Sequence, residues 1–308
     1  MSYHPTGPAT GVEEYERILT LMDERRFEEA LIRGRVLLEA TDTDSPVRCK
    51  THNLICWLFI EGTKHPTPEA VLHGEEAVRL ADQIGWPQLK AESLCNLASA
   101  YFQIGDYQAA QETYQAMVNL LTANPSYLPV GLTLAHQGLA QLALTQGRPE
   151  EAIQLLGAAE AACTTEEARI LLPDLYRRRA LAYVKANQPD KAAETLTQIP
   201  EGAFASGPRS LWWKTHLRFT VARIELARGH FTAARPQVLN ALALARELGD
   251  LPVIAECSCL LALIDHAEGR KEAHKRARAA ITYAIHSGRR DVLEDVRERL
   301  NAYQLGEL

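Results

Sequence analysis

The sequence lacks the marks of a membrane or secreted protein. Its longest uninterrupted apolar run, residues 54–60, is far shorter than the roughly 20 residues a membrane-spanning helix needs. Residues 1–11 show neither the basic start nor the apolar stretch of a secretion signal. The 6 cysteines of the 308-residue chain form no Cys-x-x-Cys pair, which disfavours a disulfide framework or a zinc site. We therefore expect a cytoplasmic protein with reduced thiols and no membrane contact.

Motifs that carry chemistry are also missing. The chain has no Gly-rich phosphate loop, no His-Glu-x-x-His zinc motif and no Gly-x-Ser-x-Gly nucleophile motif. The nearest approach to a ligand pair is Asp265-His266 at an expected helix end, and we interpret both as ordinary surface side chains. The sequence therefore predicts a protein that is not an enzyme and that binds no cofactor or metal.

The charge balance argues against a nucleic-acid partner. The net charge is −6, whereas dedicated nucleic-acid binders usually present a basic face. A basic cluster near the C-terminus comprises Arg270, Lys271, Lys275, Arg276, Arg278, Arg289 and Arg290. It could bind nucleic acid or phosphate, but acids lie close by and no tight aromatic interleaving offers base stacking. A solvated face is the favoured interpretation.

A regular ladder of alanines dominates the rest of the chain. Ala30, Ala70, Ala110, Ala152, Ala192, Ala234 and Ala273 follow one another at intervals of about 40 residues. Each stands near the start of a segment with helical apolar spacing, preceded by a turn and a second such segment. A period this regular indicates an array of helical hairpins, each packing on its neighbours.

One repeat unit of this series resembles a known repeat family. Between residues 91 and 124, two amphipathic segments flank the turn Gly105-Asp106. Gly105 can end a helix in the left-handed conformation, and Asp106 can cap the next one. The positions that resemble the tetratricopeptide (TPR) signature are Leu97, Ala98, Tyr101, Gly105, Tyr107, Ala110 and Tyr114. The period of about 40 exceeds the usual 34 and resembles the long-period type of bacterial TPR regulators.

The resemblance implies an all-α fold, a right-handed TPR-like superhelical solenoid of about seven helix-turn-helix repeats. We expect a flexible tail over residues 1–11, seven repeats over 12–288, and a C-terminal capping helix with a tail over 289–308. Glu294, Arg297, Glu298 and Arg299 should lie on the solvated outer face of that last helix.

The TPR resemblance also implies a binding groove lined by the first helices of the repeats. Side-chain amides, which can hydrogen-bond both polar groups of a peptide backbone, precede cations along that face. Guanidinium groups suit carboxylates, so we expect an extended peptide with acidic side chains or a free C-terminus. The predicted binding residues are Asn53, Asn96, Ser99, Gln103, Gln137, Gln141, Arg177, Arg178, Lys185 and Arg223.

Several interpretations stay open from the sequence. The first is a protein- or peptide-binding scaffold without catalysis. The second is a ligand- or peptide-responsive regulatory protein, and the third is a homo-oligomeric assembly scaffold. The adjacent pair Trp212 and Trp213 is either core packing or an anchor for a partner, because tryptophan is enriched in binding hot spots.

Overall fold

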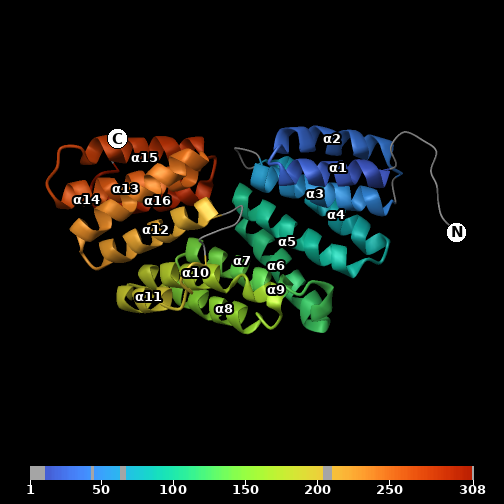
Figure 1. Ribbon diagram of the computed structural model, residues 1–308, viewed down its shortest axis with the longest axis horizontal. Coiled ribbons are helices and arrows are strands. Elements are labelled where there is room, and N and C mark those ends of the chain that lie inside the picture. The colour runs from blue at the N-terminus through green and yellow to red at the C-terminus, as the bar shows by residue number, and fades with distance from the viewer. Residues whose placement is uncertain (1–10, 43–44, 63–66, 204–209, 307–308) are drawn as a thin grey trace. The chain divides into compact units, whose positions relative to one another are not determined.

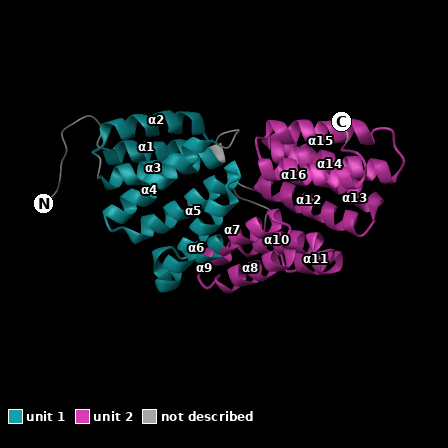
Figure 2. Cartoon of the chain, turned by 180° about the vertical axis from the view of Figure 1, so that it is seen from behind, with its two compact units in different colours: residues 1–135 teal, residues 136–308 magenta. Residues whose placement is uncertain are grey.

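The computed structural model describes residues 11–42, 45–62, 67–203 and 210–306. Within these ranges all regular structure is helical, and the helices follow one another as antiparallel hairpins (Figure 1). The chain forms two compact units, residues 1–135 and 136–308 (Figure 2), and the boundary falls within one helix. The units are described separately below.

Unit 1 contains three hairpins of consecutive helices. Their bounds are α1 (Gly11–Asp23) with α2 (Phe27–Ala40), α3 (Pro46–Gly62) with α4 (Pro68–Gln83), and α5 (Pro87–Ile104) with α6 (Tyr107–Ala123). A short 3-10 turn, η1 (Pro125–Tyr127), follows before the first residues of α7 (Gly131–Thr145). The predicted tail ends where α1 begins, at Gly11, and residues 1–10 lie outside the described part of the chain.

Unit 2 contains four hairpins, and the first of them begins with the rest of α7. The hairpins are α7 with α8 (Pro149–Ala161), α10 (Leu172–Lys185) with α11 (Pro189–Leu196), α12 (Ser210–Ala227) with α13 (Phe231–Leu248), and α14 (Leu251–Ala267) with α15 (Ala273–His286). The single turn α9 (Glu166–Arg169) precedes α10, and α16 (Arg290–Ala302) ends the unit. The described residues therefore form the predicted seven hairpins and one terminal helix.

The alanine ladder explains how the hairpins close. All seven ladder alanines lie in the first turn of a second helix and are at most 3% exposed. Each stands where the second helix approaches the first, so a methyl group fits and a longer side chain would have to displace the neighbouring helix.

The turn of the third hairpin forms as its sequence predicts. Gly105 ends α5 with φ of 85°, a left-handed conformation that glycine adopts without strain. Asp106 precedes α6, and its carboxylate accepts a hydrogen bond of 3.1 Å from the backbone N–H of Ala109. The interior of this repeat is filled by Leu97, Ala98 and Tyr114, all buried.

Two general expectations can be compared with this fold. All six cysteines are free thiols, and five of them are buried, as expected for reduced core residues. None of the helices in the described ranges is both long enough and apolar enough to cross a membrane.

Candidate binding face of unit 2

The ten predicted binding residues divide between the two units. Asn53, Asn96, Ser99 and Gln103 belong to unit 1, and Gln137, Gln141, Arg177, Arg178, Lys185 and Arg223 belong to unit 2. Each set is therefore considered on its own helices.

In unit 1 the amides link α3 to α5. The Asn96 amide donates a hydrogen bond of 2.9 Å to the Asn53 side-chain oxygen. The Gln103 amide donates at 3.2 Å to the backbone oxygen of Ile60. One donor of each pair is thus used within the protein, and the remaining amide donors and acceptors stay available, because each amide can make several bonds.

Ser99 lies differently from the three amides. Its hydroxyl donates to the backbone oxygen of Cys95 at 2.9 Å and lies 3.1 Å from the Tyr114 hydroxyl of α6. The side chain therefore points toward its own second helix. A role for Ser99 in binding stays a prediction, and this geometry makes Asn53 and Asn96 the better candidates.

In unit 2 a single buried carboxylate gathers four of the predicted residues. Asp174 of α10 is 5% exposed. It accepts hydrogen bonds from Arg177 at 2.8 Å, from Arg178 at 2.7 Å and from the Gln137 amide at 3.3 Å. Arg178 also approaches the side-chain oxygen of Gln141 at 3.4 Å. We call these five residues the Asp174 network.

The charges of the Asp174 network stabilise one another. Burial alone would raise the pKa of Asp174, but the charges and hydrogen bonds of Arg177 and Arg178 outweigh it and hold that pKa well below its usual range. Burial lowers the pKa of Arg177, which is 4% exposed, and Asp174 only partly offsets that shift. Arg177 is therefore committed to Asp174, whereas Arg178, with a side chain 26% exposed, is the more accessible cation.

A second group of charges lies where α10, α12, α14 and α16 approach each other. Lys185 of α10 forms an ion pair of 3.0 Å with Asp295 of α16. Asp295 also pairs with Arg299, which lies 3.5 Å from Glu256 of α14. These contacts tie the first and the last helix of the group together, and we call it the α16 cluster.

Arg223 of α12 completes the α16 cluster and differs from its other cations. Its guanidinium lies 5.7 Å from the ring centre of Phe219. Burial lowers its pKa, and the negative charge of Glu256 opposes that shift. Among the described residues, however, no carboxylate lies within ion-pair distance of Arg223. Its fork of N–H donors is thus the least satisfied on this face.

Arg299 corrects one of our expectations. We predicted that it would be solvated on the outer side of the last helix, but its side chain is only 17% exposed. Its Nη1 atom is buried without a hydrogen-bond partner among the described residues. The prediction was wrong because the pattern within α16 marks the side that packs on α15, and it does not show that α10 and α14 approach another side.

The expectation for Asp265 was also wrong. Asp265 is 1% exposed rather than a surface side chain. Its carboxylate pairs with Arg235 and Arg276, each at 2.6 Å. His266 is exposed, as expected. The described residues contain no group of three or more His, Cys, Asp or Glu side chains that could hold a metal ion.

The sequence did not predict that Asp174, Glu256, Asp295 or Arg299 belong to the candidate binding face. One usable signal was present for Glu256, which is the only acidic residue in the apolar stretch 251–264. A lone carboxylate in such a helix usually has a cationic partner. No comparable signal marked Asp295, because its partner on α10 is remote in sequence.

The tryptophans lie beside the Asp174 network. The Trp212 ring packs on His216, with ring centres 3.9 Å apart, and the Arg177 guanidinium lies 6.0 Å from the Trp212 ring centre. Trp213 meets Trp212 edge-on. Both tryptophans are half-buried, so Trp212 extends the polar face with an aromatic surface.

Comparison with known proteins identifies the repeat and the fold. Residues 91–120 match the family model of the tetratricopeptide repeat, in the stretch that carries the predicted signature. A search of curated protein sequences finds no match. Solved structures provide the other comparisons.

Three solved structures illustrate the similarity. A Rap protein complexed with competence and sporulation factor aligns with a TM-score of 0.65 and 13% identity, over 96% of this chain and 88% of that one. The apo quorum sensor NprR from B. thuringiensis gives 0.67 and 15%, over 89% and 76%. Aspartyl phosphate phosphatase F from Bacillus subtilis gives 0.54 and 14%, over 100% and 96%. At such identities the similarity shows the fold, an all-α TPR-like array.

Proposed function

We propose that this chain is a cytoplasmic protein that binds an extended peptide and does not act as an enzyme. We further propose that a carboxylate of the peptide, from an acidic side chain or a free C-terminus, binds at the α16 cluster. The observation that carries the proposal is Arg223, a half-buried arginine without an ion-pair partner among the described residues, whose pKa is lowered by burial. The Rap structure solved in complex with competence and sporulation factor, which shares the fold, supports a ligand-binding role.

Unsatisfied N–H donors favour a carboxylate at this position. A buried N–H donor that lacks a partner loses hydration without compensation. Arg299 has such a donor in its buried Nη1, and the half-buried Arg223 has no ion-pair partner among the described residues. A carboxylate placed between Arg223 and Arg299 would supply acceptors for both, and charge-assisted bonds of this kind are the strong ones. The amides of Gln137 and Gln141 could hold the backbone of the same peptide, in keeping with their predicted role.

The test is a selection from a peptide library that contains each sequence with a free and with an amidated C-terminus. Wild-type protein should enrich peptides with a free C-terminus or with Asp and Glu. Arg223→Gln should lose this enrichment, since it removes the unpaired fork. Arg218→Gln is the matched control, because Arg218 lies exposed on the same helix and bonds Gln237. Equal enrichment by the wild type and Arg223→Gln contradicts the proposed subsite.

A second candidate function is a peptide-responsive regulator, and the Lys185–Asp295 ion pair favours it. That pair joins α10 to α16, so an incoming carboxylate would compete with Asp295 for the same cations. The fold is shared with a quorum sensor. Hydrogen exchange of residues 290–302 tests this candidate: a selected peptide should accelerate exchange there. If a selected peptide leaves hydrogen exchange of residues 290–302 unchanged, the regulator candidate is contradicted and the binding scaffold is favoured. Light scattering would separate both from the predicted homo-oligomeric scaffold.

A further inference from the structure

Unit 2 has a cavity on another side of α14. It occupies about 280 Å³ and is formed by α13, α14 and α15. Ser258 lines it, whereas Glu256 of the α16 cluster stands two positions earlier on the same helix. Residues two apart on a helix are rotated by about 200°, so they point to nearly opposite sides of it. The cavity is therefore separate from the proposed peptide-binding face.

Three cationic side chains and one acidic side chain line the cavity. Arg246 comes from the last turn of α13, and Lys275 and Arg276 come from the first turns of α15, whereas Glu272 is the acid. Among the described residues, neither Arg246 nor Lys275 has a carboxylate within ion-pair distance. Arg276 is held by its bond of 2.6 Å to Asp265. The lining thus carries excess positive charge, and two of its cations have no internal counter-ion.

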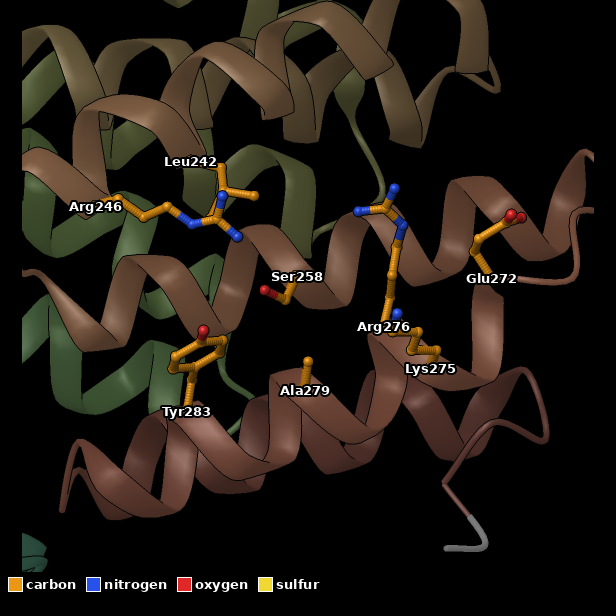
Figure 3. A pocket seen from close by; sticks show the side chains of 8 residues that line it. All are labelled: Leu242, Arg246, Ser258, Glu272, Lys275, Arg276, Ala279 and Tyr283. Carbon is orange, nitrogen blue, oxygen red and sulfur yellow. The ribbon is translucent and has the colours of Figure 1, made fainter.

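The cavity also presents two hydroxyls. Ser258, which is 6% exposed, donates its hydroxyl hydrogen to the backbone oxygen of Ile254 at 2.7 Å. Its oxygen can therefore accept a hydrogen bond from a ligand. Tyr283 packs its ring against the buried core, and no described residue is its hydrogen-bond partner. Figure 3 shows Arg246, Ser258 and Tyr283 directed toward one another from three helices, with Glu272 at the opposite end.

The size and walls of the cavity restrict the ligand further. A volume of about 280 Å³ corresponds to roughly nine water molecules, which suits a small metabolite and not a folded partner. Leu242 and Ala279 give part of the wall an apolar surface. A ligand with a doubly charged head, a short carbon body and a hydroxyl group would use the cations, the apolar wall and the Ser258 oxygen together.

We propose that this cavity binds the phosphate monoester of a small hydroxylated molecule. A monoester carries a charge of about −1.5 to −2 at neutral pH and three strong acceptor oxygens. Arg246 and the Tyr283 hydroxyl donate to those oxygens. Lys275 and Arg276, which lie nearer the Glu272 end of the cavity, add positive charge to it. The charge pattern of the sequence alone favoured a solvated basic face here, and the structure adds a half-open cavity with the buried Ser258 in its wall, although Arg246 and Lys275 remain exposed.

The test is calorimetric titration of the full chain with glycerol 3-phosphate, inorganic phosphate, succinate and a phosphoserine peptide. Glycerol 3-phosphate should bind saturably and more tightly than succinate, which carries two charges but no tetrahedral head. Arg246→Gln should weaken binding roughly tenfold, and Lys275→Gln should weaken it less, because Lys275 acts through its charge from the other end of the cavity. Tyr283→Phe should weaken it less, because it removes one neutral donor. Arg278→Gln is the control, since Arg278 is exposed on α15 and does not line the cavity.

Three results would overturn the proposal. One is the absence of saturable binding of glycerol 3-phosphate at millimolar concentration. Another is an equal loss in Arg278→Gln, which would mean that only the overall charge attracts the anion. The third is binding of the phosphoserine peptide without binding of glycerol 3-phosphate, which would assign the surface to a protein partner. Circular dichroism of each variant identifies any loss that comes from unfolding.

Discussion

Replacing Asp174 by asparagine should destabilise the protein strongly. The substitution keeps the shape of the side chain but removes the only negative charge of the Asp174 network. Arg177 is 4% exposed, so its charge would remain buried without a counter-ion. Removing one partner of a buried pair typically costs about 3–5 kcal/mol. Arg178 can turn part of its charge to solvent, since its side chain is 26% exposed, so we assign the cost to Arg177.

A double substitution separates this explanation from lost packing. Arg177→Met removes the buried charge while keeping an apolar side chain of similar length, and Asp174 then still pairs with Arg178. The Asp174→Asn, Arg177→Met double variant has no uncompensated charge at this position. Its unfolding free energy should therefore exceed that of Asp174→Asn alone by roughly 1–3 kcal/mol. Urea unfolding followed by circular dichroism measures all four proteins.

The pH dependence supplies an independent check. The pKa of Asp174 is depressed in the folded protein, so its stabilisation is present above the unfolded pKa of about 4 and is lost as pH falls through the lower folded pKa. The difference between wild type and Asp174→Asn should be constant from pH 5 to 8 and should shrink below about pH 4. A cost under about 1 kcal/mol at pH 7, or a double variant as unstable as the single one, refutes the reasoning.

Three further predictions concern other parts of the chain. Burial, with the nearby charge of His73, lowers the pKa of His52 to about 4, so unfolding free energy should drop by up to about 3 kcal/mol between pH 6.5 and 4. Urea titrations of His52→Gln should show a smaller drop, with the rest due to His73, whose pKa burial also lowers. Ala234→Leu should cost about 1–3 kcal/mol in thermal unfolding because Ala234 is fully buried, whereas exposed Ala233→Leu should be nearly neutral. Asp295→Asn should increase the affinity for library-selected acidic peptides several-fold, measured by fluorescence anisotropy, since it removes the internal competitor.

The fold could be predicted because its signals are local. The ladder alanines, the Gly105-Asp106 turn and the apolar spacing of each helix all lie within one hairpin. Hairpin packing requires a small residue at the same position each time, so the requirement is visible as a period. The structure confirms seven hairpins and a terminal helix in the described residues.

The charged contacts could be predicted only in part because neither the burial of a charged side chain nor the approach of a neighbouring helix is visible within one helix. The sequence predicts Arg177 and Arg178 as peptide-binding cations, and in the structure both bond Asp174, one helical turn earlier on the same helix. That spacing was visible in the sequence, but its burial was not. Asp265 and Arg299 were placed at the surface because nothing in their own helices shows which neighbours approach them. The register of one helix against the next is set by the packing of the whole array.

The carboxylates of Asp174 and Asp295 therefore have different consequences for function. Asp174 holds its two arginines through bonds within one helix, so those two ion pairs do not depend on where another helix lies. Asp295 reaches Lys185 from another helix, so that ion pair depends on where α16 lies. A ligand carboxylate can replace Asp295 without leaving a cation unpaired, and Asp295, with a side chain 17% exposed, can then turn to water. Of the Asp174 network and the α16 cluster, only the α16 cluster can exchange an internal carboxylate for one from a ligand. Ligand binding should therefore change the hydrogen exchange of α16.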